Sequence, residues 1–231
     1  MPVAILPARG SSKRLPRKNV RSFLDRPALS YPVEAAIKSA VFDRILVSTE
    51  DEEIGAAAEA AGAEVINRPP DLATDDATMA DVCRHALGLL DMEGIRPESF
   101  CCLYATALLI LPEDLRGGFE RLQTDPATDA VIATAGYNMT PLQAFREGEP
   151  LKPMFPEYSH LNTRHHPKLV GDAGAFYWIR TASFERGGTF FPTRMQGYHL
   201  PKLRVADIDT EEDWMIAECL MSMRHDQDDG D

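Results

Sequence analysis

The stretch ILPARGSSKRLPRKNV, residues 5–20, joins a short apolar run to a turn of small and cationic residues. Seven lysines or arginines and one acid, Asp25, lie between Arg9 and Arg26, although the 231-residue chain carries a formal net charge of -12. A strand that ends in a Gly/Ser turn with closely spaced cations is typical of a phosphate cradle, in which backbone N–H groups face the anion. The alternative is a solvated basic loop.

Strand and helix patterns alternate from this stretch to about residue 135. Short apolar runs predict strands at residues 3–7, 44–50, 63–67, 99–105 and 129–135. Apolar residues at helical spacing predict helices at residues 31–42, 51–62, 78–90 and 112–123. This alternation is the signature of a mostly parallel sheet covered on both faces, so the sequence predicts an α/β fold.

Capping patterns predict where two of these helices begin. Thr49 with Glu52 and Thr78 with Asp81 both have the spacing of a capping box. Gly62 is expected to end the helix that Thr49 opens, because glycine adopts the left-handed conformation at low cost.

Residues 137–171 interrupt the alternation. They contain prolines, aromatics and charges without clear periodicity, over a length too great for an ordinary loop. We interpret them as an inserted arm or dimerisation element within a single domain that spans residues 1–231. Strands are expected again at residues 174–180 and 203–209, followed by a closing helix and a frayed tail at residues 226–231.

Bulk composition excludes several classes of protein. Hydrophobic residues make up 44% and charged residues 26% of the chain, as in ordinary soluble domains. The acidic balance argues against a nucleic-acid binder. The four cysteines form no CxxC pair, and Cys101 and Cys102 lie in an apolar run, which favours buried thiols and a reduced, cytoplasmic setting. The sequence contains no apolar run of the roughly 18 residues that a membrane span needs and no signal-peptide pattern.

The segment PARGSSKRLPRKN closely resembles the signature of the sugar-acid cytidylyltransferases, the CMP–nonulosonic acid synthetases. Further segments that match are FDRILVSTEDEEI, GAEVINRP, YATA, DAGAFYW and DIDTEEDW, so that the resemblance runs from about residue 3 to residue 218. YATA and DAGAFYW are more similar to the pseudaminic acid branch than to the sialic acid branch. The resemblance implies a Rossmann-like three-layer nucleotidyltransferase fold with an inserted dimerisation arm, and a homodimer.

The resemblance also implies a reaction. CTP and a nine-carbon 2-keto sugar acid give the CMP-sugar and pyrophosphate, when the anomeric hydroxyl attacks the α-phosphate with Mg²⁺ assisting and Mn²⁺ as an alternative. Such chemistry needs charge neutralisation around a triphosphate more than covalent help. The acceptor stays open between pseudaminic acid and a legionaminic, sialic or related acid. A non-catalytic nucleotide-binding homologue is the remaining alternative.

The motif positions imply which residues hold the nucleotide. Arg9, Lys13 and Lys18 are implied as catalytic ligands of the triphosphate and the leaving group. The loop residues implied beside them are Ala8, Gly10, Ser11 and Ser12. Ser11 replaces the usual second glycine, so either the turn tolerates a side chain or phosphate binding is altered.

Two residues match positions that read cytosine in the family, Asn19 and Arg68. An amide and a guanidinium suit the N3 and O2 acceptors and the N4 donor of that base. Without the resemblance, Arg68 reads as a loop arginine before two prolines. Arg14 and Arg17 are either further ligands or exposed charges.

Asp207 and Asp209 form the clearest acidic pair. On the expected strand at residues 203–209 they share one face, with Cα atoms about 6.5–7 Å apart. Two carboxylates at that separation suit a hard cation such as Mg²⁺, and the resemblance implies a metal site here with Asp209 among the catalytic residues. Asp213 is assigned instead to a capping box with Thr210 at the start of the closing helix.

The sugar-acid site is implied by segments that resemble the acceptor pocket. Its candidate residues are Tyr104, Thr106, Gln143, Arg164 and Asp172. An arginine suits the sugar carboxylate, since it binds carboxylates bidentately. Leu108 departs from the proline expected after YATA, which leaves the loop shape open. His160, His165 and His166 are interpreted as loop residues and not as metal ligands, and Phe176 and Trp178 as core.

Overall fold

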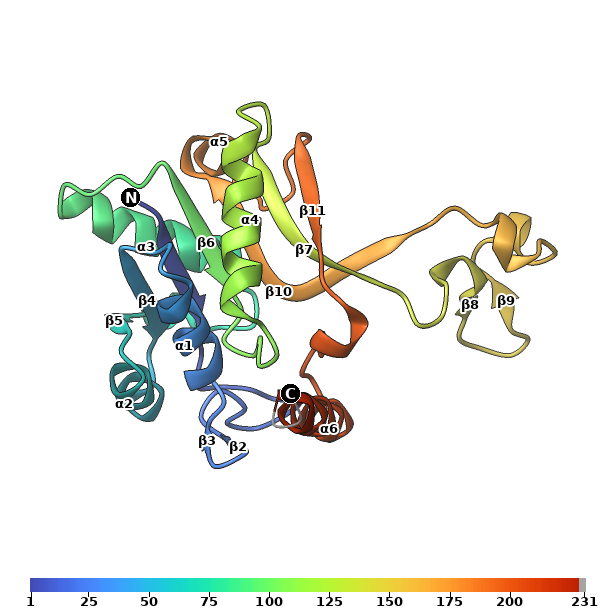
Figure 1. Cartoon of the computed structure of the whole chain (residues 1–231), viewed down its shortest axis with the longest axis horizontal. Helices are drawn as coiled ribbons and strands as arrows, with labels where there is room; N and C mark the ends of the chain where they lie inside the picture. Colours follow the sequence, from blue (N-terminus) through green and yellow to red (C-terminus); the bar gives the residue numbers. More distant parts are fainter. Residues whose placement is uncertain (229–231) are drawn as a thin grey trace.

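The computed structural model describes residues 1–228, so the last three residues of the tail expected to fray lie outside the described residues. A seven-stranded sheet with the order β11-β7-β10-β6-β1-β4-β5 forms the centre of the molecule (Figure 1). Its strands are β1 (Val3–Pro7), β4 (Arg44–Thr49), β5 (Glu64–Asn67), β6 (Ser99–Leu103), β7 (Ala130–Gly136), β10 (Val170–Arg180) and β11 (Met195–His199). Only β10 runs antiparallel to its neighbours, so the expected mostly parallel α/β sheet is confirmed.

Helices cover both faces of this sheet, as the alternating sequence pattern predicts. They are α1 (Ser30–Ser39), α2 (Glu52–Ala60), α3 (Met79–Met92), α4 (Pro112–Thr124) and α5 (Thr181–Gly187). The closing helix α6 (Glu211–Asp228) belongs to neither layer, and its Trp214 packs on Phe23 in a separate cluster. Ala4 and Leu6 of β1 pack with α1, α2 and α4, whereas Val3 and Ile5 pack with α3 and α5. Successive side chains of a strand point to opposite faces, so this one apolar run joins two cores.

The capping predictions have different outcomes. Thr78 and Asp81 form the expected capping box at α3. The prediction for α2 is wrong, because Thr49 still belongs to β4 and Asp51 caps the helix by accepting from the backbone N–H groups of Glu53 and Ile54. Gly62 follows α2 with a positive φ of 94°, as expected for a helix end.

The expected strand at residues 203–209 is wrong. The strand in this region is β11, and the segment that was expected to be a strand contains only the 3-10 helix η5 (Lys202–Arg204). The sequence pattern misses β11 because it is an edge strand that pairs with β7 alone and is partly exposed along its length. The short pair β2 (Ser22–Phe23) and β3 (Arg26–Pro27), and α5, were also missed.

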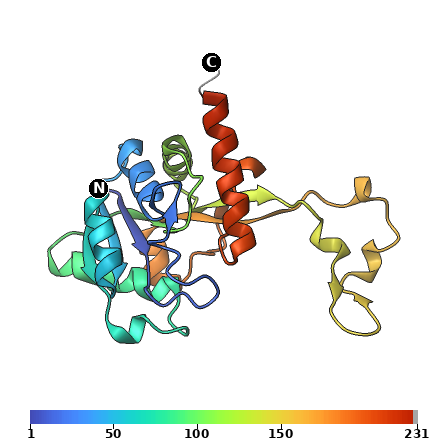
Figure 2. The same ribbon diagram turned by 90° about the horizontal axis from the view of Figure 1, so that it is seen from below.

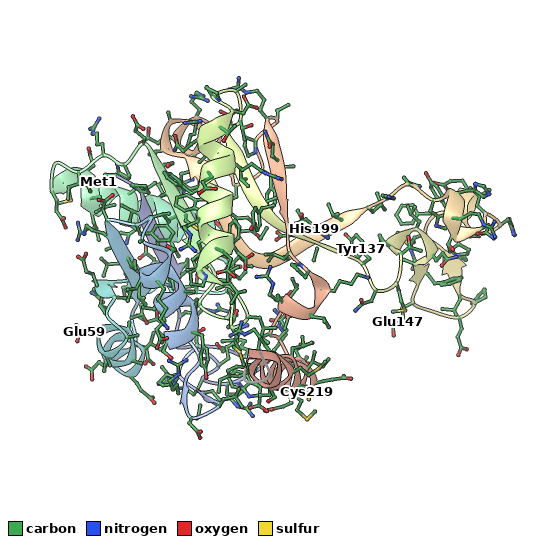
Figure 3. All side chains as sticks on the ribbon, viewed as in Figure 1. Met1, Glu59, Tyr137, Glu147, His199 and Cys219 are labelled. Atoms are coloured by element: carbon green, nitrogen blue, oxygen red, sulfur yellow. The ribbon has the colours of Figure 1, made fainter. Side chains whose placement is uncertain are left out.

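Residues 137–169 project from the sheet as an arm (Figures 1 and 2). The arm contains β8 (Phe145–Arg146), β9 (Lys152–Pro153), η2 (Pro141–Gln143), η3 (Pro156–Tyr158) and η4 (Thr163–His165). Its two connections to the sheet are the ends of β7 and β10, which pair at Gly136 and Val170. Figure 3 labels Tyr137 and His199 at its base and Glu147 on the arm itself. Its role in dimerisation stays a prediction.

The predicted core residues are buried. Cys101 and Cys102 are fully buried thiols, and Phe176 and Trp178 are fully buried aromatics. The ring of Trp178 stacks on Phe42 with centroids 4.9 Å apart. Among residues 1–228, no helix has the length and apolar character that crossing a bilayer requires.

Gly118 lets α4 pack closely on this aromatic core, and its replacement by alanine is expected to destabilise the protein by about 1–3 kcal/mol through overpacking. A Cβ at this position would lie 2.7 Å from Cε2 of Phe176 and 2.9 Å from Cδ1 of Trp178. Gly88 in α3 is the matched control, because a Cβ there meets nothing within 4 Å. Gly88→Ala is expected to stabilise by about 0.5–1 kcal/mol. Urea denaturation of both variants measures the difference, and equal effects would contradict the packing argument.

Candidate active site

A cavity of about 280 Å³ opens where β1, β5 and β6 end. Carboxyl ends of parallel strands meet at one edge of a sheet, where α/β proteins bind their ligands. The sequence-predicted residues that line it are Arg9, Ser12, Lys13, Lys18, Asn19, Arg68, Tyr104, Thr106 and Asp209. The structure thus brings most of the candidate residues of the nucleotide half to one place.

The turn that follows β1 and the buried Ala8 needs glycine at residue 10 but not at residue 11. A Cβ on Gly10 would lie 2.6 Å from Oδ2 of Asp51, and the Gly10 N–H donates to Oε1 of Glu50 at 2.7 Å. Ser11 does not adopt a positive φ. The turn therefore accommodates the serine side chain without backbone strain.

Asp75 neutralises two cations of this loop. Nη1 of Arg9 contacts Oδ1 of Asp75 at 2.8 Å, and Nζ of Lys13 contacts its other oxygen. These hydrogen bonds, from Lys13 first and then Arg9, hold the pKa of Asp75 below its usual range. A phosphate group that binds Arg9 and Lys13 must compete with this carboxylate. Sequence reasoning did not identify Asp75, although the loop after β5 contains three aspartates, which indicate an acidic surface there.

Lys18 joins this loop to the opposite end of the chain. Its Nζ donates to the backbone oxygen of Ile208 at 2.5 Å and lies 3.4 Å from Oδ1 of Asp209. Arg14 contacts the other oxygen of Asp209 at 2.6 Å. Arg17 points elsewhere and pairs with Asp51 and Glu53 at the start of α2. Arg14 therefore lies at the cavity, whereas Arg17 supports the neighbouring helix.

A small apolar cluster explains why these distant segments meet. Leu15 of the basic loop, Leu108 and Ile208 are all buried in it, together with Trp214 of α6. Ile208 anchors the loop between η5 and α6, and the aspartates on either side of it stay accessible to solvent. Asp207 and Asp209 thus owe their positions to this buried anchor and not to the strand face that the sequence suggested. Leu108, at the expected proline position, packs in the same cluster.

The two aspartates interact electrostatically. Desolvation by the surrounding protein raises the pKa of Asp207, and the nearby charge of Asp209 raises it further, while Lys18 opposes both effects. Asp213 forms the expected capping box, in which its carboxylate accepts from the backbone N–H and the hydroxyl of Thr210, and it also accepts from the backbone N–H of Asp209 at 3.1 Å.

The acidic pair fits a divalent cation of the magnesium type. Residues 1–228 contain no group of three or more His, Cys, Asp and Glu side chains placed to hold a metal ion by themselves. Mg²⁺ commonly takes one or two protein carboxylates and completes its shell with phosphates and water. A bound cation would relieve the electrostatic repulsion between the carboxylates of Asp207 and Asp209.

Asn19 and Arg68 are both buried at the cavity. Nη2 of Arg68 donates to the backbone oxygen of Ser48 at 2.6 Å, and burial lowers the pKa of Arg68. Nδ2 of Asn19 donates to the backbone oxygen of Arg9 at 3.0 Å. Asn19 therefore helps to fix the basic loop, whereas Arg68 is held against the end of β4.

The acceptor candidates divide into two groups. Tyr104 and Thr106 line the cavity, and Asp172 is connected to Tyr104 through the hydroxyl of Tyr177. Sequence reasoning assigned no role to Tyr177, because it lies in an expected strand between Phe176 and Trp178, which were interpreted as core. Gln143 and Arg164 lie on the arm, in η2 and η4, and neither lines this cavity. The structure does not bring them to the nucleotide site of their own chain.

The cavity thus concentrates cations in an otherwise acidic chain, and two carboxylates, Asp75 and Asp209, pair with them. Such a set of charges suits a nucleoside triphosphate and its cation. The sequence model of the cytidylyltransferase family matches residues 3–153. The pseudaminic acid cytidylyltransferase of Campylobacter jejuni is 32% identical over 226 residues, which cover 96% of this chain and 97% of that protein. The chain belongs to the cytidylyltransferase family.

Other relatives agree with this assignment. The N-acylneuraminate cytidylyltransferase of Escherichia coli is 30% identical, over 93% of this chain and 51% of that protein. A CMP:2-keto-3-deoxy-manno-octonic acid synthetase, solved in complex with CTP, superposes with a TM-score of 0.72 at 16% identity and covers 96% of this chain and 99% of that one. At that identity the superposition shows the shared fold, and it confirms the nucleotidyltransferase fold that the sequence implied.

Proposed function

We propose that the protein transfers CMP from CTP to the anomeric hydroxyl of a nonulosonic acid, with pseudaminic acid as the favoured acceptor, and releases pyrophosphate. The observation that carries the proposal is the identity to a pseudaminic acid cytidylyltransferase over almost the full length of both chains. The cavity supports it, because cations, carboxylates and buried polar groups gather there.

The basic loop is proposed to bind the triphosphate. Arg9 and Lys13 exchange Asp75 for phosphate oxygens, and Lys18 neutralises charge at the reacting phosphate and the departing pyrophosphate. Ala8, Gly10, Ser11 and Ser12 are proposed to complete the cradle with backbone N–H groups. Those of Ala8, Gly10 and Ser12 donate to Ser48, Glu50 and Gly10 in this structure, so they must exchange these partners to bind phosphate. Asn19 and Arg68 are proposed to read the cytosine edge.

Asp207 and Asp209 would hold the divalent cation, Mg²⁺ or alternatively Mn²⁺. When bound, the cation supplies positive charge to the phosphate oxygens. Lys18 and Arg14, which contact Asp209, orient its carboxylate from the protein side. Tyr104, Thr106 and Asp172 are proposed to position the acceptor sugar.

The arm is proposed to form a homodimer. It exposes large apolar side chains, including Met139, Phe145 and Leu151, which are 86%, 58% and 65% exposed. Apolar surface of this kind marks an interaction site. Gln143 and Arg164 remain candidates for sugar binding only in such a dimer, in which an arm reaches the second copy. A cytoplasmic location belongs to the proposal, because all four cysteines are free thiols.

Pyrophosphate release tests the proposed function. The protein is incubated with each NTP, Mg²⁺ and a panel of nonulosonic acids. Turnover with CTP and pseudaminic acid is the expected result. If CTP turns over with a legionaminic or sialic acid but not with pseudaminic acid, the alternative acceptor is correct. The similarity to an N-acylneuraminate cytidylyltransferase is the observation that supports this alternative. CTP binding without any release would contradict the proposal and indicate a non-catalytic nucleotide-binding homologue.

A further inference from the structure

Three side chains form a hydrogen-bonded chain that begins at the cavity. The hydroxyl oxygens of Tyr104 and Tyr177 lie 2.8 Å apart, and the Tyr177 hydroxyl donates to Oδ2 of Asp172 at 2.5 Å. The second carboxylate oxygen of Asp172 accepts from the Gly174 N–H at 2.9 Å. The ring of Tyr177 is only 4% exposed and stacks on Phe190, which fixes its position.

The chemistry of these groups sets the direction of the chain. An ionised carboxylate only accepts hydrogen bonds, so the single hydroxyl proton of Tyr177 must point to Asp172. Tyr177 then has no proton left for Tyr104, and the proton in their shared hydrogen bond must come from Tyr104. The hydroxyl of Tyr104 consequently turns only lone pairs toward the cavity.

The electrostatic environment keeps the phenols neutral. Burial is the main cause that raises the pKa of Tyr104, to about 12, so that its hydroxyl keeps its proton at neutral pH. Burial also raises the pKa of Tyr177, and its hydrogen bond to Asp172 adds to the effect. The proton that Tyr104 shares with Tyr177 is therefore present whenever the reaction runs.

We propose that this chain makes Tyr104 an obligatory hydrogen-bond acceptor, which selects a hydroxyl or amide N–H donor on the acceptor sugar. Asp172 and Tyr177 are positioning residues that act through Tyr104. The inference rests on the proposed function. The position of Tyr104 favours the sugar over the base, because its hydrogen-bond partner Tyr177 lies on β10, and the proposed cation ligand Asp207 lies beside Gly174 of that strand.

The selectivity follows from the cost of a mismatch. A substrate hydroxyl or N–H donates a hydrogen bond to the lone pairs of Tyr104. An ether or carboxylate oxygen at the same position cannot form this hydrogen bond, because both atoms are then acceptors. Sites that hydrogen-bond a substrate group discriminate strongly against analogues without it. A deoxy or O-methyl analogue at the contacting position should therefore lose turnover.

Asp172→Asn tests the direction of the chain with minimal change in shape. The Gly174 N–H still requires an acceptor, so the amide oxygen faces Gly174 and the amide NH2 faces Tyr177. Tyr177 must then donate to Tyr104, and Tyr104 must donate into the cavity. We expect kcat/KM for the acid to fall about 10–100-fold, with CTP affinity and Tm retained. Tyr104→Phe, which removes the acceptor, should give a comparable loss.

Tyr177→Phe separates the chain from the charge of Asp172. It leaves the carboxylate in place but frees the Tyr104 hydroxyl to rotate, so a smaller loss in kcat/KM for the acid is expected. Tyr198→Phe is the matched control, because its hydroxyl reaches only Asp114 at 3.5 Å, outside this cavity. It should leave kcat/KM unchanged.

The outcomes separate this inference from the proposed function. If the wild-type protein turns over CTP and a nonulosonic acid but Asp172→Asn keeps the wild-type kcat/KM, the inference fails and the function stands. If kcat/KM for the acid falls in Asp172→Asn but not in Tyr177→Phe, the effect belongs to the charge of Asp172 and not to the hydrogen-bonded chain. This outcome would also overturn the inference. Absence of turnover by the wild-type protein with every acid would overturn the proposed function and the inference with it.

Discussion

Asp207→Asn is expected to lower kcat by about 10²–10³-fold, the usual cost of removing a stabiliser of transition-state charge. The same variant should keep or slightly raise the Tm of the unliganded protein. Desolvation and Asp209 both raise the pKa of Asp207, which means that its negative charge is disfavoured in the folded state. Asparagine removes this charge and replaces a proposed anionic ligand of the cation by a neutral amide oxygen, which binds a divalent cation more weakly. The rise in Tm is small because Asp207 remains accessible to solvent.

The pH dependence of this effect has a definite sign. A folded-state pKa above the unfolded value means that the folded protein binds the proton more tightly. Wild-type stability therefore decreases as pH rises from the unfolded pKa of about 3.9 through the raised pKa. The stability gain of Asp207→Asn should be greatest above that window and vanish below it.

Glu212→Gln is the control for Asp207→Asn. It removes an exposed carboxylate in the first turn of α6, which is not a proposed ligand of the cation, and should leave kcat unchanged. Pyrophosphate release and thermal unfolding, measured at pH 4 to 8, provide both readouts. Near wild-type kcat in Asp207→Asn would show that the cation does not depend on this carboxylate.

Lys18→Met is expected to lower kcat by about 10²–10³-fold, because it removes the cation proposed to stabilise the reacting phosphate. Methionine keeps the apolar stem and loses only the charge and its hydrogen bonds to Ile208 and Asp209. Lys38→Met is the matched control on an exposed face of α1, where Lys38 pairs with Glu34. Steady-state kinetics and CTP titration check the result. Equal kcat values for the two variants would rule out the role proposed for Lys18.

The parallel half of the sheet could be predicted because its strands are buried on both faces and read as continuous apolar runs. β1 and β6 are examples, since nearly every side chain in them is buried. β11 lacks this signal, because an edge strand contacts one neighbour and carries Gly197 at its centre. The segment VADID, residues 205–209, alternates apolar and acidic residues as a strand would, although Ile208 is its one buried residue.

The candidate site could be predicted where its residues directly follow strands. Arg68 and Tyr104 directly follow β5 and β6, and Arg9 comes two residues after β1, which pairs with β6 and is separated from β5 by β4 alone. Asp75 could not be assigned, since its partner Lys13 lies 62 positions away and only the folded chain joins them. Tyr177 was missed because it lies in a strand between two buried aromatics. In such a strand the sequence does not distinguish a tyrosine with a functional hydroxyl from a residue that only fills the core.

The central position of β10 has a consequence for synthesis of the chain. β10 lies between β6 and β7, and neither of those strands pairs with the other. A nascent polypeptide that has emerged only as far as the arm therefore exposes the edges of β6 and β7 that β10 will later cover, and unpaired strand edges are templates for aggregation. β10 must leave the ribosome, up to residue 180, before it can pair with both strands. We therefore expect the sheet to form late in translation and the nascent chain to need chaperones until then.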